Sequence, residues 1–158
     1  MKWRIGRDGR RGPLPICWER ELVAEGFVDT NVFVHAQTYD QHAEECLRLL
    51  EGLRAGTVQA QIEPLVLHEL SYALPHYRKE MGRAEIGEYL LAVLAWEGLT
   101  GDKGLLINAV ERWRNTPGLA FVDAYLAARA ARTESPVFTK NVAELRAQGI
   151  TVPNPLPS

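Results

Sequence analysis

The chain has 158 residues, of which 46% are hydrophobic and 24% are charged, and its net charge is −2 at pH 7. This length and composition fit one globular domain that can bury a core without disulfides or a structural metal. No apolar run approaches the roughly 20 residues that a membrane-spanning helix requires, so no such helix is expected. The chain has two cysteines, Cys17 and Cys46, which lack the spacing of metal ligands. Cys46 lies on the apolar stripe of a predicted helix as a core thiol, and this cysteine usage suits the reducing cytoplasm.

Positive charge is concentrated at the N-terminus. Residues 1–20 contain six basic and two acidic side chains, a balance of +4, so the remaining chain carries −6. Such an arm could follow the phosphates of a nucleic acid, or it could be a solvated terminus. We therefore predict three parts: a basic arm over residues 1–25, a folded domain over 26–153 and a Pro-rich tail over 154–158.

The first half of the folded domain alternates short strands with helices. After Asp40, a helix-capping residue, apolar positions recur at helical spacing until Gly56, a residue typical of helix C-termini. Pro64 suits the first turn of another helix, which should end before Pro75. The predicted strands are 27–28 and 57–62, and the predicted helices are 40–56 and 64–74.

The second half contains more helix. We predict helices at 83–96, 102–113, 119–131 and 141–149, and strands at 137–139 and 150–152. Strands that alternate with helices in this way indicate the α/β class. We therefore expect a three-layer fold in which a short, mostly parallel sheet is covered by helices on both faces.

Two acidic residues interrupt apolar helix surfaces. Glu69 has Leu65 and Tyr72 as helical neighbours, and Asp123 lies between Leu119 and Leu126 in the same way. This spacing predicts that both carboxylates lie on inward faces. A buried carboxylate without a partner is costly, so a purely structural role is hard to assign.

Two further polar residues follow predicted strands. Asp29 comes directly after residues 27–28, and Asn141 follows residues 137–139. Because ligand sites of open α/β sheets lie beyond the carboxyl ends of the strands, we expect both to meet Glu69 and Asp123 there. Three carboxylates in one pocket repel one another unless a cation neutralises them, and an all-oxygen set favours Mg²⁺ or Mn²⁺.

Each of these residues also has a structural interpretation. Asp29 and Asn141 could cap helices, and Glu69 and Asp123 could each pair with an arginine such as Arg129. Any one of the four residues alone would more often be structural. The occurrence of all four at matching places in the strand–helix alternation favours a metal site.

The motifs FVDTN, PLVLHEL, FVDAYLAARA and VFTKN, in this order, resemble those of the PIN-domain nucleases, and most closely the VapC-type toxins of toxin–antitoxin pairs. The resemblance covers about residues 27–152. It implies that the metal is held by Asp29, Glu69 and Asp123, and that Asn141 completes the catalytic pocket. The supporting residues that it implies are Thr30, Asn31 and Thr139. Many relatives have Asp where this chain has Asn141, which puts tight binding of a second metal in doubt.

The resemblance also implies a function and partners. The expected function is hydrolysis of RNA phosphodiester bonds with Mg²⁺ or Mn²⁺, by a toxin that a cognate antitoxin protein neutralises. A homodimer is expected too, with the apolar residues Tyr89, Leu90 and Leu94 as interface or core. Two alternatives stay open: a non-catalytic PIN-like module that acts through partner binding, and a DNA nuclease. Five basic residues are candidate phosphate contacts: Arg54, Arg78, Lys79, Arg83 and Lys140.

Overall fold

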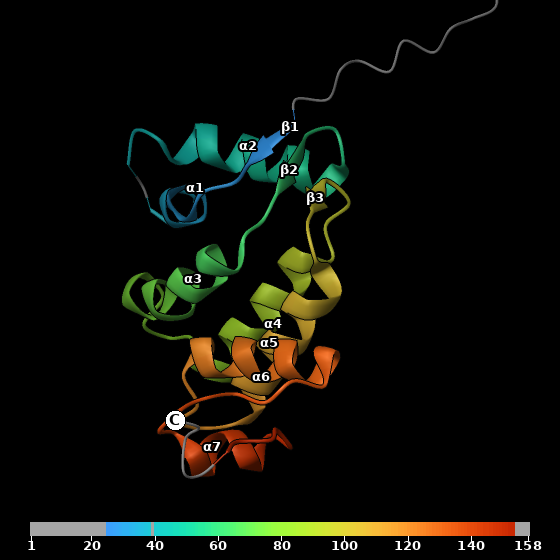
Figure 1. Ribbon diagram of the computed structural model, residues 1–158. Coiled ribbons are helices and arrows are strands. Elements are labelled where there is room, and N and C mark those ends of the chain that lie inside the picture. Colours follow the sequence, from blue (N-terminus) through green and yellow to red (C-terminus); the bar gives the residue numbers. More distant parts are fainter. Residues whose placement is uncertain (1–24, 39, 154–158) are drawn as a thin grey trace, which may run out of the picture.

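The computed structural model describes residues 25–38 and 40–153 and is shown in Figure 1. Residues 1–24 of the predicted arm over 1–25, which include Cys17, and the tail over 154–158 lie outside the described residues. In chain order the elements are β1 Glu25–Phe27, α1 Thr30–His35, α2 Ala43–Ala55, β2 Gln59–Gln61, α3 Pro64–Tyr77, α4 Arg83–Leu94, β3 Leu99–Thr100, α5 Lys103–Asn115, α6 Phe121–Thr133 and α7 Val142–Ala147. No helix in these described ranges is long and apolar enough to cross a membrane.

The sheet is short and entirely parallel, with strand order β1-β2-β3. One row across it pairs Gly26 with Ala60 and Ala60 with Leu99, and both Ala60 and Leu99 belong to the main hydrophobic core. These observations confirm the predicted α/β class with a parallel sheet.

The opposite face of the sheet is open to solvent. The next row pairs Phe27 with Gln61 and Gln61 with Thr100, and all three side chains are exposed, Phe27 by 75%. The expected helix cover is therefore absent at these three positions. A hollow of about 330 Å³ on the sheet is lined by residues of all three strands.

β3 was not predicted from the sequence, because two residues are too few to show a period. It is positioned by Gly98, where the chain passes close to β2. A Cβ built on Gly98 would lie 2.1 Å from the carbonyl oxygen of Val58 and 2.6 Å from that of Leu53. Only glycine permits this approach, so Gly98 determines how β3 joins the sheet.

Two predicted helix boundaries are wrong. α2 begins at Ala43 with His42 as its N-cap, while Asp40 lies further back and accepts a hydrogen bond from the His42 N–H at 2.8 Å. α3 continues through Pro75 to Tyr77. A proline in the last turn removes a single backbone hydrogen bond, and burial of the neighbouring Leu74, 1% exposed, favours continuing the helix.

The C-terminal residues form a small unit of their own, here called the C-terminal unit and defined as residues 137–152. Its apolar side chains make a second core with two alanines of α6, separate from the main core. The members of this second core are Ala127, Ala130, Leu145, Ile150 and Val152.

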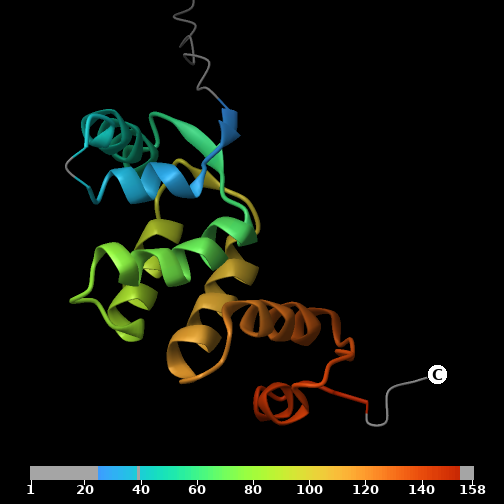
Figure 2. The same cartoon turned by 90° about the vertical axis from the view of Figure 1, so that its left-hand side faces the viewer.

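The predicted strands at 137–139 and 150–152 are wrong, because neither segment joins the sheet. Instead, Val137 donates its N–H to the carbonyl oxygen of Thr151 at 3.0 Å within the C-terminal unit. The unit lies beyond α6, at the opposite end of the molecule from the sheet (Figures 1 and 2).

Candidate functional site

Thr30, the residue after Asp29, connects α1 with Glu69 of α3. Asp29 follows the carboxyl end of β1 and caps α1, its Oδ2 accepting from the Asn31 N–H at 3.3 Å. Thr30 is buried, and its hydroxyl donates to Oε2 of Glu69 on α3 at 2.5 Å. We call Asp29, Thr30 and Glu69 the first half-site.

Asp123 and Asn141 form a second pair. Asp123 lies in the first turn of α6, and the Asn141 amide Nδ2 donates to its Oδ2 at 3.1 Å. The N–H of Asn141 donates to the hydroxyl of Thr139 at 3.0 Å, so Thr139 contacts the backbone of this loop. Asn141 is the N-cap residue of α7, but its side chain makes no capping bond. We call Asp123, Thr139 and Asn141 the second half-site.

The two half-sites do not join into one cation site within the chain. No group of three His, Cys, Asp or Glu residues among residues 25–38 and 40–153 lies close enough together to hold a metal ion. The predicted convergence of Asp29, Glu69 and Asp123 is therefore not seen in a single copy. As arranged here, the three carboxylates do not fit the cation that the sequence resemblance implies.

Neither Glu69 nor Asp123 is buried, which corrects the prediction that both carboxylates lie on inward faces. Glu69 is exposed, and its helical neighbours Leu65 and Tyr72 are 72% and 60% exposed. On α6, Asp123 is half-buried, while Val122 and Leu126 are 46% and 39% exposed. Of the helical neighbours that suggested burial, Leu65, Tyr72 and Leu126 are thus exposed, whereas Leu119 is buried.

The structural alternative of ion pairing finds no support in the described residues. None of Asp29, Glu69 and Asp123 takes part in a salt bridge there. The guanidinium of Arg129, the proposed partner, lies 3.4 Å from the hydroxyl of Tyr125 instead. The capping alternative does hold for Asp29, in that its side chain caps α1.

Two of the candidate phosphate contacts are used inside the protein. The guanidinium of Arg83 donates to the carbonyl oxygens of Trp113, Thr116 and Leu119 at 2.6–3.0 Å and lies 4.6 Å from the centroid of the Trp113 ring. Burial lowers the pKa of Arg83 from its usual value. Arg78 donates to a carboxylate oxygen of Glu80 at 2.5 Å and to Gln37 at 2.8 Å. Arg54, Lys79 and Lys140 are exposed.

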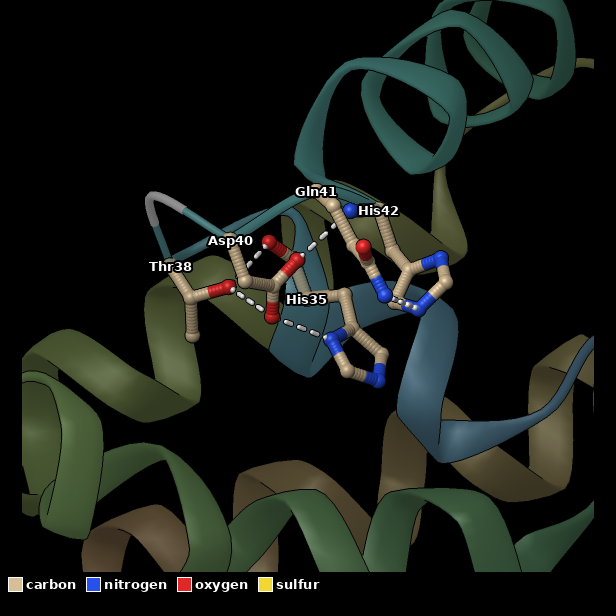
Figure 3. A network of polar contacts seen from close by, with 5 residues as sticks. All are labelled: His35, Thr38, Asp40, Gln41 and His42. Atoms are coloured by element: carbon tan, nitrogen blue, oxygen red, sulfur yellow. Dashed lines mark hydrogen bonds and ion pairs between the residues drawn. The ribbon is translucent and has the colours of Figure 1, made fainter.

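A polar network away from the half-sites organises the chain between α1 and α2 (Figure 3). Asp40 accepts from the Thr38 hydroxyl at 2.8 Å and lies 2.6 Å from Nδ1 of His35, whose ring is in edge contact with His42. The hydrogen bond with His35, followed by that from Thr38, holds the pKa of Asp40 far below its usual range. This network shapes one side of a cleft of about 790 Å³ that none of the four predicted site residues lines.

His68 adjoins Glu69 and has no role in the site predicted from the sequence. It lies where α3 meets α6, with its ring centroid 5.3 Å from that of Tyr72 and 6.2 Å from that of Phe121. Its Nδ1 is buried without a hydrogen-bond partner in the described part of the chain. The only signal for it in the sequence was its position next to Glu69.

The apolar residues that suggested a dimer surface are core residues. Leu90 and Leu94 are fully buried, and Tyr89 packs against the same core. Burial raises the pKa of the Tyr89 hydroxyl.

Comparison with known families gives one match. The model of the PIN domain matches residues 26–147, a span that contains all four predicted site residues. Searches of curated proteins and of solved structures gave no match to the chain. Because the family match covers most of the chain and agrees with the α/β architecture, the chain belongs to the PIN-domain family.

Proposed function

We propose that this PIN-domain protein is a divalent-metal-dependent endoribonuclease. Proteins of the PIN family are typically nucleases and generally use divalent metal ions. The observation that carries the proposal is the presence, within the matched span, of Asp29, Glu69 and Asp123, three acidic residues without salt-bridge partners in the described chain. Carboxylates left without a cationic partner at a surface suit a dissolved cation and a phosphate substrate.

The contacts within the half-sites give their residues distinct tasks. Asp29, Glu69 and Asp123 are the proposed ligands of Mg²⁺ or Mn²⁺. Thr30 fixes the orientation of Glu69 through its hydroxyl, and Asn141 does the same for Asp123 through its amide. The two half-sites would have to come together before the three carboxylates could hold one ion, since they are separated in the described chain.

Substrate phosphates need positive charge near the carboxylates. Lys140 adjoins Asn141 in sequence and is exposed, which makes it the first choice for a phosphate contact. Arg83 is not available for this task, since three carbonyl oxygens occupy its guanidinium.

The biological setting is proposed on the resemblance to VapC-type toxins. We expect the chain to act in the cytoplasm as the toxin of a toxin–antitoxin pair, neutralised by its cognate antitoxin. Expression in cells with and without the neighbouring gene, followed by mapping of new RNA ends, tests this role. Growth arrest that the neighbouring gene relieves is the expected result, and unchanged growth with an unchanged RNA-end profile contradicts it.

The proposed activity is tested with purified protein and single-stranded RNA. Cleavage should require Mg²⁺ or Mn²⁺ and stop in excess chelator, and Asp29→Asn, Glu69→Gln and Asp123→Asn should each remove most of it. Glu44→Gln, which neutralises an exposed carboxylate of α2 paired only with Arg48, is the matched control and should cleave normally. Cleavage that persists in all three variants would contradict the assignment.

A non-catalytic binding module is the second candidate. It is favoured by the separation of the two half-sites within one chain. The melting temperature with and without millimolar Mn²⁺ separates the two candidates. An ion at 100 times its dissociation constant stabilises the fold by roughly 2.7 kcal/mol. A melting temperature that neither Mg²⁺ nor Mn²⁺ changes, together with intact RNA, would favour the binding module.

A further inference from the structure

An exposed tyrosine lies one helix turn from Glu69, a proposed metal ligand on α3. Tyr72 follows Glu69 by three residues, a spacing that places both side chains on the same side of the helix. The Tyr72 side chain is 60% exposed. Long side chains of a helix lean toward its N-terminus, so the Tyr72 ring extends over the turn that contains His68 and Glu69.

The orientation of this ring is fixed by His68. The ring centroids of Tyr72 and His68 are 5.3 Å apart and the two planes cross at 76°, the edge-to-face arrangement that aromatic pairs prefer. His68 packs in turn against Phe121, with ring centroids 6.2 Å apart, and Phe121 belongs to the main core. The Tyr72 ring is thus anchored to the core through His68, while most of its surface remains in solvent.

These three rings cross the junction between the helices that carry the two half-sites. Tyr72, His68 and Glu69 lie on α3, and Phe121 lies on α6, two residues before Asp123. The two helices contact each other in the fold. A substrate held at the carboxylates of both helices therefore crosses this junction.

α3 offers a nucleic acid an aromatic surface and no strong positive charge. The helix contains neither lysine nor arginine, and Glu69 is its only acidic residue. The helical neighbours of Glu69 on its own side are Leu65 and Tyr72, which are 72% and 60% exposed. Such a surface does not attract phosphates, but every nucleobase has a π face that stacks on an aromatic ring. The part of a nucleotide that fits this side of α3 is therefore its base.

We propose that Tyr72 is a substrate-binding residue on which an unpaired RNA base stacks, next to the phosphate that is cleaved. This step rests on the proposed function, because the ion at Glu69 is what places the phosphate there. The rise from Glu69 to Tyr72 is about 4.5 Å along the helix axis, which lies within the reach of one nucleotide. Bases of a duplex are covered on both faces, so the RNA is single-stranded at this position.

The first experiment measures RNA binding in excess chelator, so that it does not depend on cleavage. The probe is fluorescently labelled oligoadenylate, either single-stranded or paired with oligouridylate. The parent should prefer the single strand, and Tyr72→Ala should bind it about 5- to 150-fold more weakly, the range expected for one lost stacking contact. Tyr72→Phe should bind as the parent does. Tyr72→Leu keeps an apolar side chain without a π system and should bind as weakly as Tyr72→Ala.

Tyr77 provides the matched control on the same helix. It is 48% exposed, and its ring makes an edge contact with a histidine, His76, at a centroid distance of 5.3 Å. It lies eight residues after Glu69, about 12 Å along the helix axis. Tyr77→Ala should therefore bind RNA as the parent does. Thermal melts of all variants establish that each one is folded.

His68 is a positioning residue in this proposal, and a conservative variant tests that role. Nδ1 of His68 has no hydrogen-bond partner in the described chain, so His68→Phe breaks no bond at that atom and keeps a ring against Tyr72. It should bind RNA as the parent does, whereas His68→Ala removes the support and should weaken binding. Weak binding by His68→Phe in a folded protein would contradict the positioning role.

The second experiment measures cleavage of single-stranded RNA in Mn²⁺. A stacked base contributes equally to the ground state and the transition state, so Tyr72→Ala should raise KM and leave kcat nearly unchanged. Glu69→Gln should instead lower kcat, because it removes a proposed ligand of the ion.

Several results would overturn the proposal. These are a parent that binds no RNA, a Tyr72→Ala variant that binds as the parent does, and a Tyr72→Leu variant that binds as well as Tyr72→Phe. Sedimentation equilibrium of the same variants identifies the other possible occupant. If Tyr72→Ala changes the mass in solution and leaves RNA binding unchanged, Tyr72 contacts protein and not RNA.

The two experiments separate this proposal from the proposed function. If the parent cleaves RNA and Tyr72→Ala keeps the KM of the parent, the stacking contact is wrong and the nuclease assignment stands. If the parent binds RNA through Tyr72 but does not cleave it in Mg²⁺ or Mn²⁺, the stacking contact stands and the nuclease assignment is wrong.

Discussion

At the scale of single residues, arginines that the sequence does not distinguish have different contacts in the structure. Arg83 and Arg54 were equivalent candidates for phosphate contact. In the structure the Arg83 guanidinium satisfies the carbonyl oxygens of Trp113, Thr116 and Leu119, between the end of α5 and the start of α6, while Arg54 stays exposed. The last carbonyls of a helix need partners from outside the helix, and Arg83 serves that of Trp113 in the last turn of α5 together with two carbonyl oxygens that follow the helix.

We predict that Arg83→Met lowers the free energy of unfolding by about 2–3 kcal/mol, because three carbonyl oxygens lose a charged donor. RNA cleavage per folded molecule should be unchanged. Arg48→Met is the control, since it removes an exposed pair with Glu44, and it should change stability by less than about 0.5 kcal/mol. Urea denaturation of both variants, with a cleavage assay beside it, measures this. If Arg83→Met has normal stability but does not cleave RNA, Arg83 contacts the substrate phosphate and the prediction is wrong.

At the scale of elements, the long periodic helices were predictable and the short strands were not. The helices over residues 40–56, 83–96 and 102–113 were placed to within a few residues, because a 3.6-residue period repeats several times in each. β3 has two residues, and its position depends on the close passage of Gly98 against Val58 and Leu53. Such a contact lies between elements and leaves no period in the sequence.

Gly98→Ala should therefore destabilise the fold by about 1–3 kcal/mol, since the added Cβ meets two backbone oxygens that cannot move independently. The matched control is Gly104→Ala in α5, where nothing lies within 4 Å of the new Cβ. That variant should be neutral or more stable by up to about 1 kcal/mol, because alanine favours helix. Thermal melts of the two variants give the comparison. Equal melting temperatures of Gly98→Ala and Gly104→Ala would show that β3 can move away from β2 at position 98 without loss of stability.

At the scale of the whole molecule, the surroundings of the carboxylates allow a functional role to be distinguished from a structural role. Asp29, Glu69 and Asp123 have no salt-bridge partners in the described chain, so neutralising them breaks no ion pair. Asparagine at position 29 can still cap α1, and asparagine at position 123 can still accept from Asn141. The carboxylates of the two half-sites therefore contribute little electrostatic free energy to the stability of the fold.

If Asp29 and Asp123 serve one ion, their losses should not add. Asp29→Asn should abolish most RNA cleavage, and the double variant Asp29→Asn with Asp123→Asn should be little worse. In excess chelator all of these variants should unfold within about 1 kcal/mol of the parent, whereas breaking a buried ion pair costs roughly 3–5 kcal/mol. Chemical denaturation in chelator and cleavage in Mn²⁺ are measured on the same samples. Strong destabilisation with near-normal cleavage would assign the aspartates a structural role.

The sequence by itself determined the α/β class, the parallel sheet, the long helices and the order of motifs by which the PIN family is recognised. These follow from local periodicity, capping residues and residue identity. The tertiary structure alone decided that segment 137–139 stays out of the sheet and that the predicted site falls into two half-sites. The reason is that a segment of three residues makes too few local contacts to fix its own position. Its position depends on which larger surface binds it, and here the alanine face of α6 binds the C-terminal unit at the end of the molecule away from β1.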